Sequence, residues 1–398
     1  MKIMSRKTFL IILRISAVVI ILVLLGPRLV AFLQRKPVEE TVVGYSTGTA
    51  LAVVNAVIEE GEITLGDVRQ PYQILLITVQ DGAHAGSQFE IEYGTRQIRN
   101  DPIRIKEGDR LLVTISSLPD GTLSAHFTDF YRRNSLFLLF AIFIGASILI
   151  SGWKGVRSLV GIMLSLAVIV LIILPGIQSG RDPLSISILG AILFVGLSLY
   201  IVYGWNVKTH AAVLGSFIAL VITGVLAYIF VTNARLTGYG DENMFFVTQM
   251  TQNQLNVRSL LLAGVLIGTL GVLDDLVISQ ASAVFELFRN NPKQTFRELF
   301  KSAMNIGQDH IAATVNTLVL AYAGASLPML LLFSFRNVDY GLAINLEFIA
   351  EEIVRTMVGS LGLFAAVPIT TALAALIAIK YRELGKFKTY LGPLNEWH

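Results

Sequence analysis

The sequence contains no cysteine, and only 15% of its 398 residues are charged. The absence of cysteine excludes disulfide-stapled folds, thiolate metal sites and cysteine nucleophiles. Soluble domains usually carry about 25% charged residues, so the low charge excludes most soluble classes. Disorder is excluded by an apolar content of 54%. The formal net charge of +3 is too small to predict a nucleic acid partner.

The apolar residues are gathered in runs of membrane length. A transmembrane helix needs about 20 mostly apolar residues, and eight runs approach that length. The first has a basic start, but its apolar core is too long for a cleaved signal peptide and no small-residue cleavage site follows, so we expect a signal anchor. The eight predicted spans are residues 8–26, 135–151, 158–177, 184–203, 210–232, 259–285, 311–334 and 357–379.

Lysine and arginine are concentrated in alternate connections between these runs. They are frequent before residue 8, at 154–157, at 208, at 289–301 and after 379, and sparse in the other short connections. Positive charge marks the cytoplasmic side of a membrane. The sequence therefore predicts a multi-pass membrane protein, with the lipid bilayer as its surroundings and both termini in the cytoplasm.

The polar stretch between the first two runs has a different pattern. Residues 73–82 and 87–94 are rich in β-branched and aromatic residues, and 106–130 resembles a hairpin that turns at Pro119-Asp120-Gly121. Residues 51–58 are a further candidate strand. A basic cluster here either binds a polyanion or forms a solvated face with nearby acids; it comprises Arg96, Arg99, Arg104, Lys106 and Arg110.

The predicted fold class is a polytopic α-helical membrane protein of about 8 spans with an inserted small extracytoplasmic β-barrel-like domain, OB- or SH3-like. The predicted organisation has four parts. They are an N-terminal signal-anchor span (1–29), the extracytoplasmic β domain (30–133), a seven-span membrane domain (134–380) and a cytoplasmic tail (381–398).

The run at 257–287 carries a stripe of small and polar residues. On a helix with 100° per residue, seven of them share about 80° of the circumference. Glycine occupies the first part, typical of close helix packing in lipid, and hydroxyl and carboxyl groups occupy the rest. We therefore expect this stripe to face the bundle interior or water. Its members are Gly264, Gly268, Gly271, Asp275, Ser279, Ser282 and Glu286.

Asp274 and Asp275 are the strongest functional signal in the sequence. A carboxylate inside a span costs roughly 2.5–3.5 kcal/mol on insertion scales. Two adjacent ones need compensation by a proton, a cation or an aqueous path. The hypothesis is that they carry a coupling ion or proton; the alternative is that they lie near the cytoplasmic end and are hydrated.

Other polar residues in the predicted spans allow two interpretations each. Asp309 either lines a path or N-caps the helix after it, and His310 either shuttles protons or is structural. Asn316 needs a hydrogen-bond partner, for which Asp275 is a candidate, and Thr317 lies beside it. Arg14 in the first span is explained by snorkelling to the interface.

The region before and within the last run combines charge with glycine. Glu347, Glu351, Glu352 and Arg355 are expected on an interfacial helix, with Arg355 paired to a glutamate. Gly359, Gly362 and, in the previous span, Gly324 are expected to support helix packing. Pro368 is expected to kink the last span, with Thr371 satisfying a freed carbonyl.

No enzyme motif is present. The sequence lacks H-E-x-x-H, G-x-x-x-x-G-K-[ST] and G-x-G-x-x-G, and no spacing predicts a metal site or cofactor. We therefore expect no catalytic residues, no metal site and no cofactor.

The chain resembles the YibE/F family of bacterial multi-pass membrane proteins, a resemblance that implies no settled substrate. It is carried by DFYRRNSL (129–136), GWKGVRSL (152–159), LPGI (174–177), GVLDDLVISQASAVFEL (271–287), NP (291–292), NIGQDHIAATVNTLVLAYAGASLP (305–328) and IAEEIVRTMVGSLGLFAAVPIT (349–370). The Asp-Asp pair in a glycine-rich span is also similar to proton-driven exporters of the RND type and to SecD/SecF export subunits, by analogy only.

The leading functional hypothesis is a secondary transporter or permease, coupled to protons or cations through Asp274, Asp275 and His310. Ser279, Ser282, Glu286, Asp309, Asn316 and Thr317 would line its path. The alternative is a non-transporting assembly or signalling protein whose outer domain binds an envelope partner. A small solute or envelope component, and a second copy or paired membrane subunit, are the candidate partners.

Overall fold

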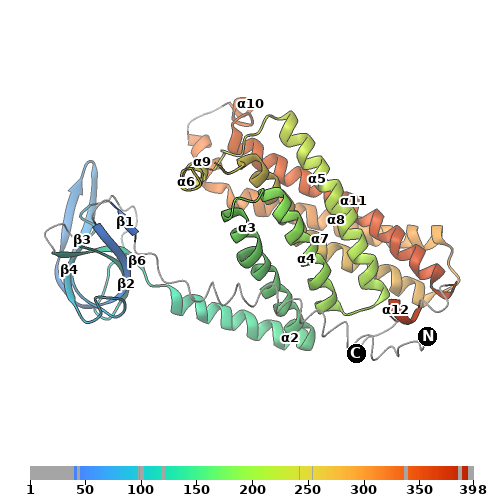
Figure 1. Cartoon of the computed structure of the whole chain (residues 1–398), viewed down its shortest axis with the longest axis horizontal. Coiled ribbons are helices and arrows are strands. Elements are labelled where there is room, and N and C mark those ends of the chain that lie inside the picture. The colour runs from blue at the N-terminus through green and yellow to red at the C-terminus, as the bar shows by residue number, and fades with distance from the viewer. Residues whose placement is uncertain are drawn as a thin grey trace. The chain divides into compact units, whose positions relative to one another are not determined.

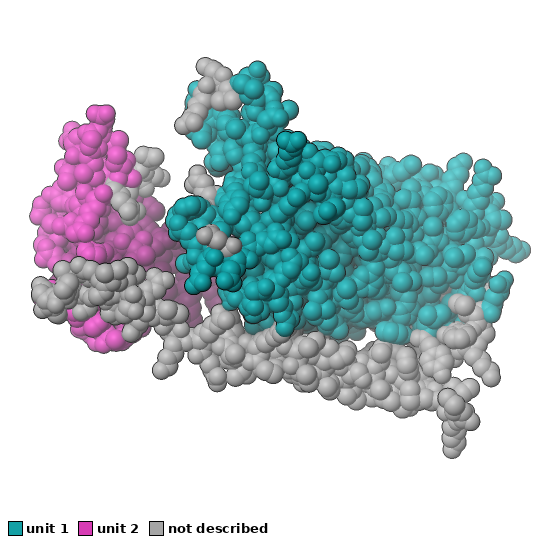
Figure 2. Space-filling model, turned by 45° about the horizontal axis from the view of Figure 1, so that its top comes forward, with its two compact units in different colours: residues 1–33, 151–398 teal, residues 34–150 magenta. Residues whose placement is uncertain are grey.

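The computed structural model describes residues 40–42, 45–96, 98, 103–117, 122–241, 243–252, 254–335, 339–383 and 388–392. The predicted first span at 8–26, with Arg14, lies outside these residues. Contacts divide the chain into two compact units, one of residues 34–150 and one of residues 151–398 with 1–33 (Figure 2). The first unit holds the β-strands and the start of a long helix, and the second holds the remaining helices.

The first unit is built on one antiparallel sheet. Its strand order is β4-β3-β2-β5-β6, and the short β1 pairs with β2. The hairpin predicted for 106–130 is confirmed, because β5 and β6 pair antiparallel from Ser117↔Leu123 onward. The strands are β1 (Glu40–Val42), β2 (Tyr45–Leu65), β3 (Val68–Val79), β4 (Gln88–Tyr93), β5 (Arg110–Ser117) and β6 (Leu123–Phe130).

The sheet curls into a half-barrel. The register of the long strand β2 against β3 shifts between Val54 and Ala56 and again between Val57 and Glu59, and such bulges bend a strand. The two edge strands then meet through aromatic rings, because Tyr93 of β4 lies 4.9 Å from Phe127 of β6, centroid to centroid. Side chains close the sheet over a core that includes Leu75, Ile77 and Leu111.

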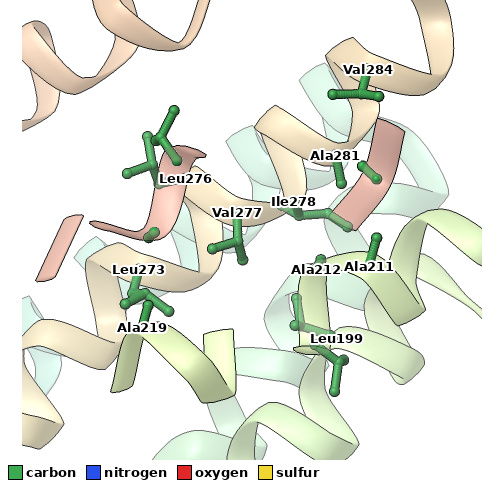
Figure 3. Close-up of a cluster of buried hydrophobic side chains, with 14 of the residues drawn as sticks. Leu199, Ala211, Ala212, Ala219, Leu273, Leu276, Val277, Ile278, Ala281 and Val284 are labelled. Carbon is green, nitrogen blue, oxygen red and sulfur yellow. The ribbon is translucent and has the colours of Figure 1, made fainter. Parts of the chain in front are cut away.

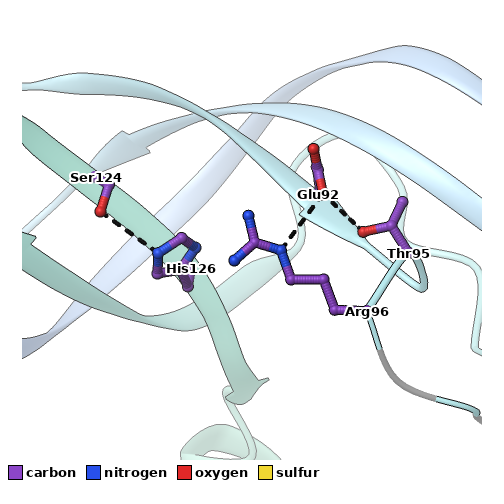
Figure 4. A network of polar contacts seen from close by, with 5 residues as sticks. All are labelled: Glu92, Thr95, Arg96, Ser124 and His126. Atoms are coloured by element: carbon purple, nitrogen blue, oxygen red, sulfur yellow. Dashed lines mark hydrogen bonds and ion pairs between the residues drawn. The ribbon is translucent and has the colours of Figure 1, made fainter.

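The predicted basic cluster of this unit is partly neutralised. Arg96 forms an ion pair with Glu92, whose carboxylate also accepts a hydrogen bond from Thr95, while His126 and Ser124 lie on β6 (Figure 4). Arg99 lies outside the described residues. The contacts at Arg96 agree with the solvated-face interpretation at that residue.

The helices begin with a broken segment. Helix α2 (Arg133–Val168) contains Gly152 in a left-handed, non-helical conformation, φ 55° and ψ −134°, so two helices meet there. A π-helical turn η1 (Ile169–Ile173) and helix α3 (Leu174–Gln178) continue the second part. The predicted spans 135–151 and 158–177 therefore correspond to two helical parts that meet directly at Gly152.

The other helices follow in chain order (Figure 1). They are α4 (Pro183–Tyr203), α5 (Val207–Asn233), α6 (Asn243–Met250), α7 (Val257–Asn290), α8 (Phe296–Ala325), α9 (Leu327–Phe335), α10 (Tyr340–Ala343), α11 (Glu347–Lys380), a 3-10 turn η2 (Tyr381–Glu383) and α12 (Lys388–Leu391). Within this unit, α6, α9 and α10 lie at one end of the bundle and α12 lies at the other (Figure 1).

Five described helices are long and apolar enough to cross a membrane, or six spans if the bent pair α8 and α9 counts as one. Eight had been predicted. One of the eight lies outside the described residues, two are the parts of the segment broken at Gly152, and the one at 311–334 is the pair bent by 61°.

Helices α5, α7 and α11 form the core of the bundle. Small residues permit the contact, and Figure 3 shows Ala219 of α5 beside Leu273 of α7. Helices α5 and α11 approach closely at two glycines. A Cβ at Gly362 would lie 2.1 Å from Thr223 Oγ1, and one at Gly215 would lie 2.2 Å from Thr370 Oγ1.

One expected helix start is wrong, and another helix extends beyond its predicted span. Asp309 is not an N-cap, because α8 begins thirteen residues earlier, where Thr295 and Glu298 form a reciprocal capping box. The interfacial helix at 347–355 and the last span are one helix, α11, with Pro368 inside it. The Thr371 hydroxyl donates to the carbonyl of Val367, one turn back.

Candidate functional site

A cavity of about 350 Å³ lies between the second part of α2, η1, α4 and α7. Its walls are largely aliphatic, but six polar side chains reach it. Cavities of this size and mixed character are typical of small-molecule sites. The polar side chains are Ser158, Ser165, Ser198, Tyr203, Asp274 and Asp275.

The two aspartates give this cavity its charge. Asp274 is only 8% exposed, whereas Asp275, one residue further round the helix, is exposed. The hydroxyl of Ser216 on α5 lies beside the Asp274 carboxyl, yet Asp274 Oδ1 and Ser216 Oγ are both buried without a hydrogen-bond partner among the described residues. A buried carboxyl oxygen with no partner is costly, so a proton, a cation or water must compensate for it.

The opposite wall is built from α2 and α4. Gly161 permits the two helices to approach, since a Cβ there would lie 3.3 Å from Ser198 Oγ and 2.9 Å from Val202 Cγ2. Ser165 donates to the Gly161 carbonyl at 2.9 Å. The π-helical turn contributes Ile169 and Ile173 to the wall. Such turns often mark functional sites, because an extra residue interrupts the regular helical ladder.

Tyr203, at the end of α4, lies beside both aspartates. Its phenol interacts electrostatically with Asp275 and Asp274, and the Lys208 ammonium lies 5.8 Å from the centroid of its ring. The carboxyl pair thus interacts with a phenol whose ring lies near a cation, at the end of the bundle predicted to be cytoplasmic.

His310 is the one residue of α8 from the predicted path that the structure brings to the aspartates. Its ring interacts electrostatically with Asp275. Asn316 is exposed, and no hydrogen bond joins it to Asp275 among the described residues. Thr317 is exposed and donates to the Ala313 carbonyl, and Asp309 is exposed in the middle of α8.

The small and polar stripe of α7 is divided: Gly271 and Asp275 line the cavity and Gly268 faces Tyr322, whereas the residues that follow lie outside the cavity. Ser279 and Glu286 are exposed, with Glu286 in an ion pair with Arg289, and Ser282 donates to the Ile278 carbonyl. None of these three residues lines the cavity. The apolar side of α7 is the buried one, because it packs on α5 and α11. The sequence predicts that the stripe faces the bundle interior or water, and the structure divides it: Gly271 and Asp275 line the cavity, and Ser279 and Glu286 lie on the exposed side of α7.

The predicted packing glycines divide into two groups. A Cβ at Gly268 would lie 2.9 Å from the Tyr322 hydroxyl, one at Gly359 3.2 Å from Thr269 Oγ1, and one at Gly362 2.1 Å from Thr223 Oγ1. At the other three, no neighbouring atom lies within 4 Å of that position, so they do not support helix contacts inside the described bundle. These are Gly264, Gly271 and Gly324, of which Gly271 lines the cavity.

Sequence reasoning missed the serines of the cavity and a buried glutamine. Ser158, Gly161 and Ser165 recur at helical spacing in one apolar run, a signal that could have been read. Gln280 is 1% exposed and joins three helices. Its amide donates to the Ala303 carbonyl of α8 at 2.9 Å and to Thr371 Oγ1 of α11 at 2.7 Å.

The chemistry available here is ion binding and proton exchange. The cavity offers two carboxyls and four hydroxyls, with a histidine near one carboxyl. No group of three or more His, Cys, Asp or Glu side chains that could hold a metal ion occurs among the residues described by the structure.

Comparison with protein families matches residues 139–380 to the family described as YibE/F-like protein. The match includes the cavity and both aspartates and leaves out the β unit. Comparisons with curated proteins and with solved structures found no match. Since the matched segment is more than half of the 398 residues, the chain belongs to the YibE/F-like protein family.

Proposed function

We propose that this protein is a membrane transporter for a small solute, coupled to a proton or cation gradient through Asp274 and Asp275. The observation that carries the proposal is the position of Asp274. Its carboxyl is 92% buried in a long apolar helix, has an oxygen without a partner, and lines a cavity. Intramembrane carboxyls facing cavities are typical of proton and ion relays.

The two aspartates carry negative charge that a proton or a cation can neutralise when it binds and expose again when it leaves. When a proton or cation binds, the cavity loses its excess negative charge, and when it leaves, the carboxylates need water or a new partner. A helix bundle whose packing responds to that difference can alternate between two states. The electrostatic interactions of Tyr203 with both aspartates and of His310 with Asp275 support these two residues as proton donors or acceptors for the pair.

Charge supports an orientation for this transporter. We place it in the bacterial cytoplasmic membrane with both termini inside and the β unit outside, because basic residues favour the cytoplasmic side. The connection between α7 and α8 carries Lys293 and is flanked by Arg289 and Arg297. The β unit would then receive or release the solute.

The test uses purified protein in liposomes with an imposed pH gradient. We expect Asp274→Asn and Asp275→Asn to abolish proton uptake, because an amide cannot exchange the proton. Glu286→Gln is the matched control, since Glu286 is an exposed carboxylate on the same helix outside the cavity. Uptake at the wild-type rate in the Asp274→Asn, Asp275→Asn double variant would refute the coupling.

One observation favours a second function, assembly with another membrane subunit or copy. The exposed face of α7 is its small and polar stripe, which includes Gly264, Gly271 and Ser279. A polar stripe in a span requires protein or water beside it. The chain contains no cysteine, so Ser279→Cys can be tested directly. Labelling by a water-soluble thiol reagent supports a path, and crosslinking between copies supports assembly.

A further inference from the structure

A second cavity, of about 500 Å³, lies where α5 ends and α7 begins. It is at the end of the bundle opposite to the connection between α7 and α8, and about 25 Å along α7 from Asp274 at 1.5 Å per residue. The function proposed above does not use it. Its polar lining includes Thr232, Arg235, Tyr239, Asn256 and Arg258.

This cavity is electropositive. Arg235 is exposed and Arg258 is half-buried, with a buried Nε that has no hydrogen-bond partner in the described part of the chain. No carboxylate lines the cavity. Glu347, at the start of α11, contacts the lining residue Thr237, and its carboxylate accepts hydrogen bonds from the Thr237 hydroxyl and the Gly238 amide. The amino end of α7, capped by Asn256, adds the positive end of a long helix dipole.

The backbone at Arg235 gives an independent reason to look for a ligand. After α5 the Leu236 amide donates to Val231 O at 3.0 Å and the Arg235 amide to Thr232 O at 3.1 Å, which is a Schellman motif. Arg235 occupies its left-handed position, with φ 55°, where glycine is normally found. An arginine held in a conformation that L residues avoid points to a use for its side chain.

We propose that this cavity binds a phosphate group. Guanidinium groups bind phosphate through paired N–H donors, and amino ends of helices favour the same anion. The hydroxyls of Thr232 and Tyr239 are further donors in the lining. The phosphate belongs either to a free solute or to a phospholipid headgroup. A headgroup is supported by the α5–α7 connection, which also carries α6 with its exposed Phe245 and Phe246.

The experiment measures two probes on the full chain. Radiolabelled inorganic phosphate is titrated in a detergent with an uncharged headgroup, and fluorescent phosphatidylglycerol is titrated in phosphatidylcholine nanodiscs. We expect wild type to bind one probe, which identifies the source. Arg258→Gln and Arg235→Gly should each weaken that binding by about tenfold or more. Arg181→Gln, at an exposed arginine outside the cavity, should leave it unchanged.

Stability separates binding from folding. Arg235→Gly should keep or raise the melting temperature while losing affinity, because glycine relieves the left-handed conformation. Arg258→Lys retains a positive charge and should keep part of the affinity, so a folding defect in Arg258→Gln cannot imitate the result. The proposal is overturned if neither probe binds wild type, or if both variants bind the probes as wild type does.

Discussion

At the scale of single residues, Asp274 is the group whose burial has no structural compensation. Its Oδ1 lacks a partner and Ser216 beside it lacks one too. The Ser216 hydroxyl interacts with the carboxyl but does not satisfy Oδ1, so the ionised carboxyl is costly to bury. A costly buried carboxyl is what the proposed coupling role requires.

That interpretation predicts that removing the Asp274 carboxylate lowers activity without lowering stability. At pH 8 we expect Asp274→Asn to leave the free energy of unfolding unchanged or to raise it by about 1 kcal/mol, because a neutral isostere has a smaller desolvation cost. Thermal melting in detergent measures the change. Asp275→Asn, at an exposed position, serves as the control and should shift the melting temperature less. A loss above about 1 kcal/mol in Asp274→Asn would show instead that the carboxylate holds the bundle together.

Gln280 is the opposite case, a buried polar side chain that is satisfied. Gln280 reaches α8 because Gly307 has no side chain there. A Cβ at Gly307 would lie 2.6 Å from Val367 Cγ1 and 2.9 Å from Gln280 Oε1. We expect Gly307→Ala to destabilise the protein by about 1–3 kcal/mol through this clash. Gly324→Ala on the same helix, with open space around it, should be neutral or slightly stabilising.

A double-mutant cycle identifies the cause. Gln280→Ala removes the amide that Gly307→Ala would strike, so the two changes together should cost less than the sum of their separate effects, as read from melting curves. Additive effects would place the strain at Val367 instead.

At the scale of secondary-structure elements, α5 and α11 are joined by two reciprocal glycine–threonine contacts. Gly362 faces Thr223, and Gly215 faces Thr370. Close backbone approach through small residues is a main source of helix association in lipid, where the hydrophobic effect does not drive contact between spans. These contacts fix α11 against α5, and α7 packs on both.

We expect Gly362→Ala to destabilise the bundle by about 1–3 kcal/mol, because the new methyl group would overlap Thr223 Oγ1. Gly264→Ala supplies the comparison, since no atom lies within 4 Å of its Cβ position. Thermal unfolding of both variants tests the contact, and Thr223→Ala should restore part of the loss in Gly362→Ala. Equal melting temperatures for the two alanine variants would contradict the packing described here.

The sequence predicts best those elements whose signal lies within a single segment of the chain. Apolar runs predicted the long helices, and Asp274 and Asp275 were conspicuous as charged residues inside one of these runs. Segments rich in β-branched residues predicted the sheet. The predicted span begins at residue 311, later in the chain than α8, because the prediction did not use the capping box at Thr295 as a start signal. The cavity could not be predicted because its wall combines α2 and α4 with α7. The outward direction of the α7 stripe depends on which helices pack on α7, which periodicity on one helix does not reveal.

At the scale of the whole molecule, the two candidate sites lie at different positions along helix α7. Helix α7 begins at the arginine-lined cavity and reaches Asp274 about 25 Å further on. The family match covers this helix and leaves out the β unit. The unit of residues 151–398 with 1–33 therefore holds both candidate sites.

The absence of cysteine allows the predicted orientation to be tested with single cysteines. Ala85 is exposed in the β unit, and Lys293 is exposed between α7 and α8. We expect Ala85→Cys to react with a membrane-impermeant maleimide in intact cells. Lys293→Cys should react only after the cells are made permeable, because its basic surroundings favour the cytoplasmic side. The cysteine-free parent controls for background, and each variant is also labelled in detergent to show that its thiol is accessible. The reverse labelling pattern would show that the protein has the opposite orientation, with the arginine-lined cavity on the cytoplasmic side of the membrane. Labelling of both sites in intact cells would remove the support for a membrane between the β unit and the α7–α8 connection.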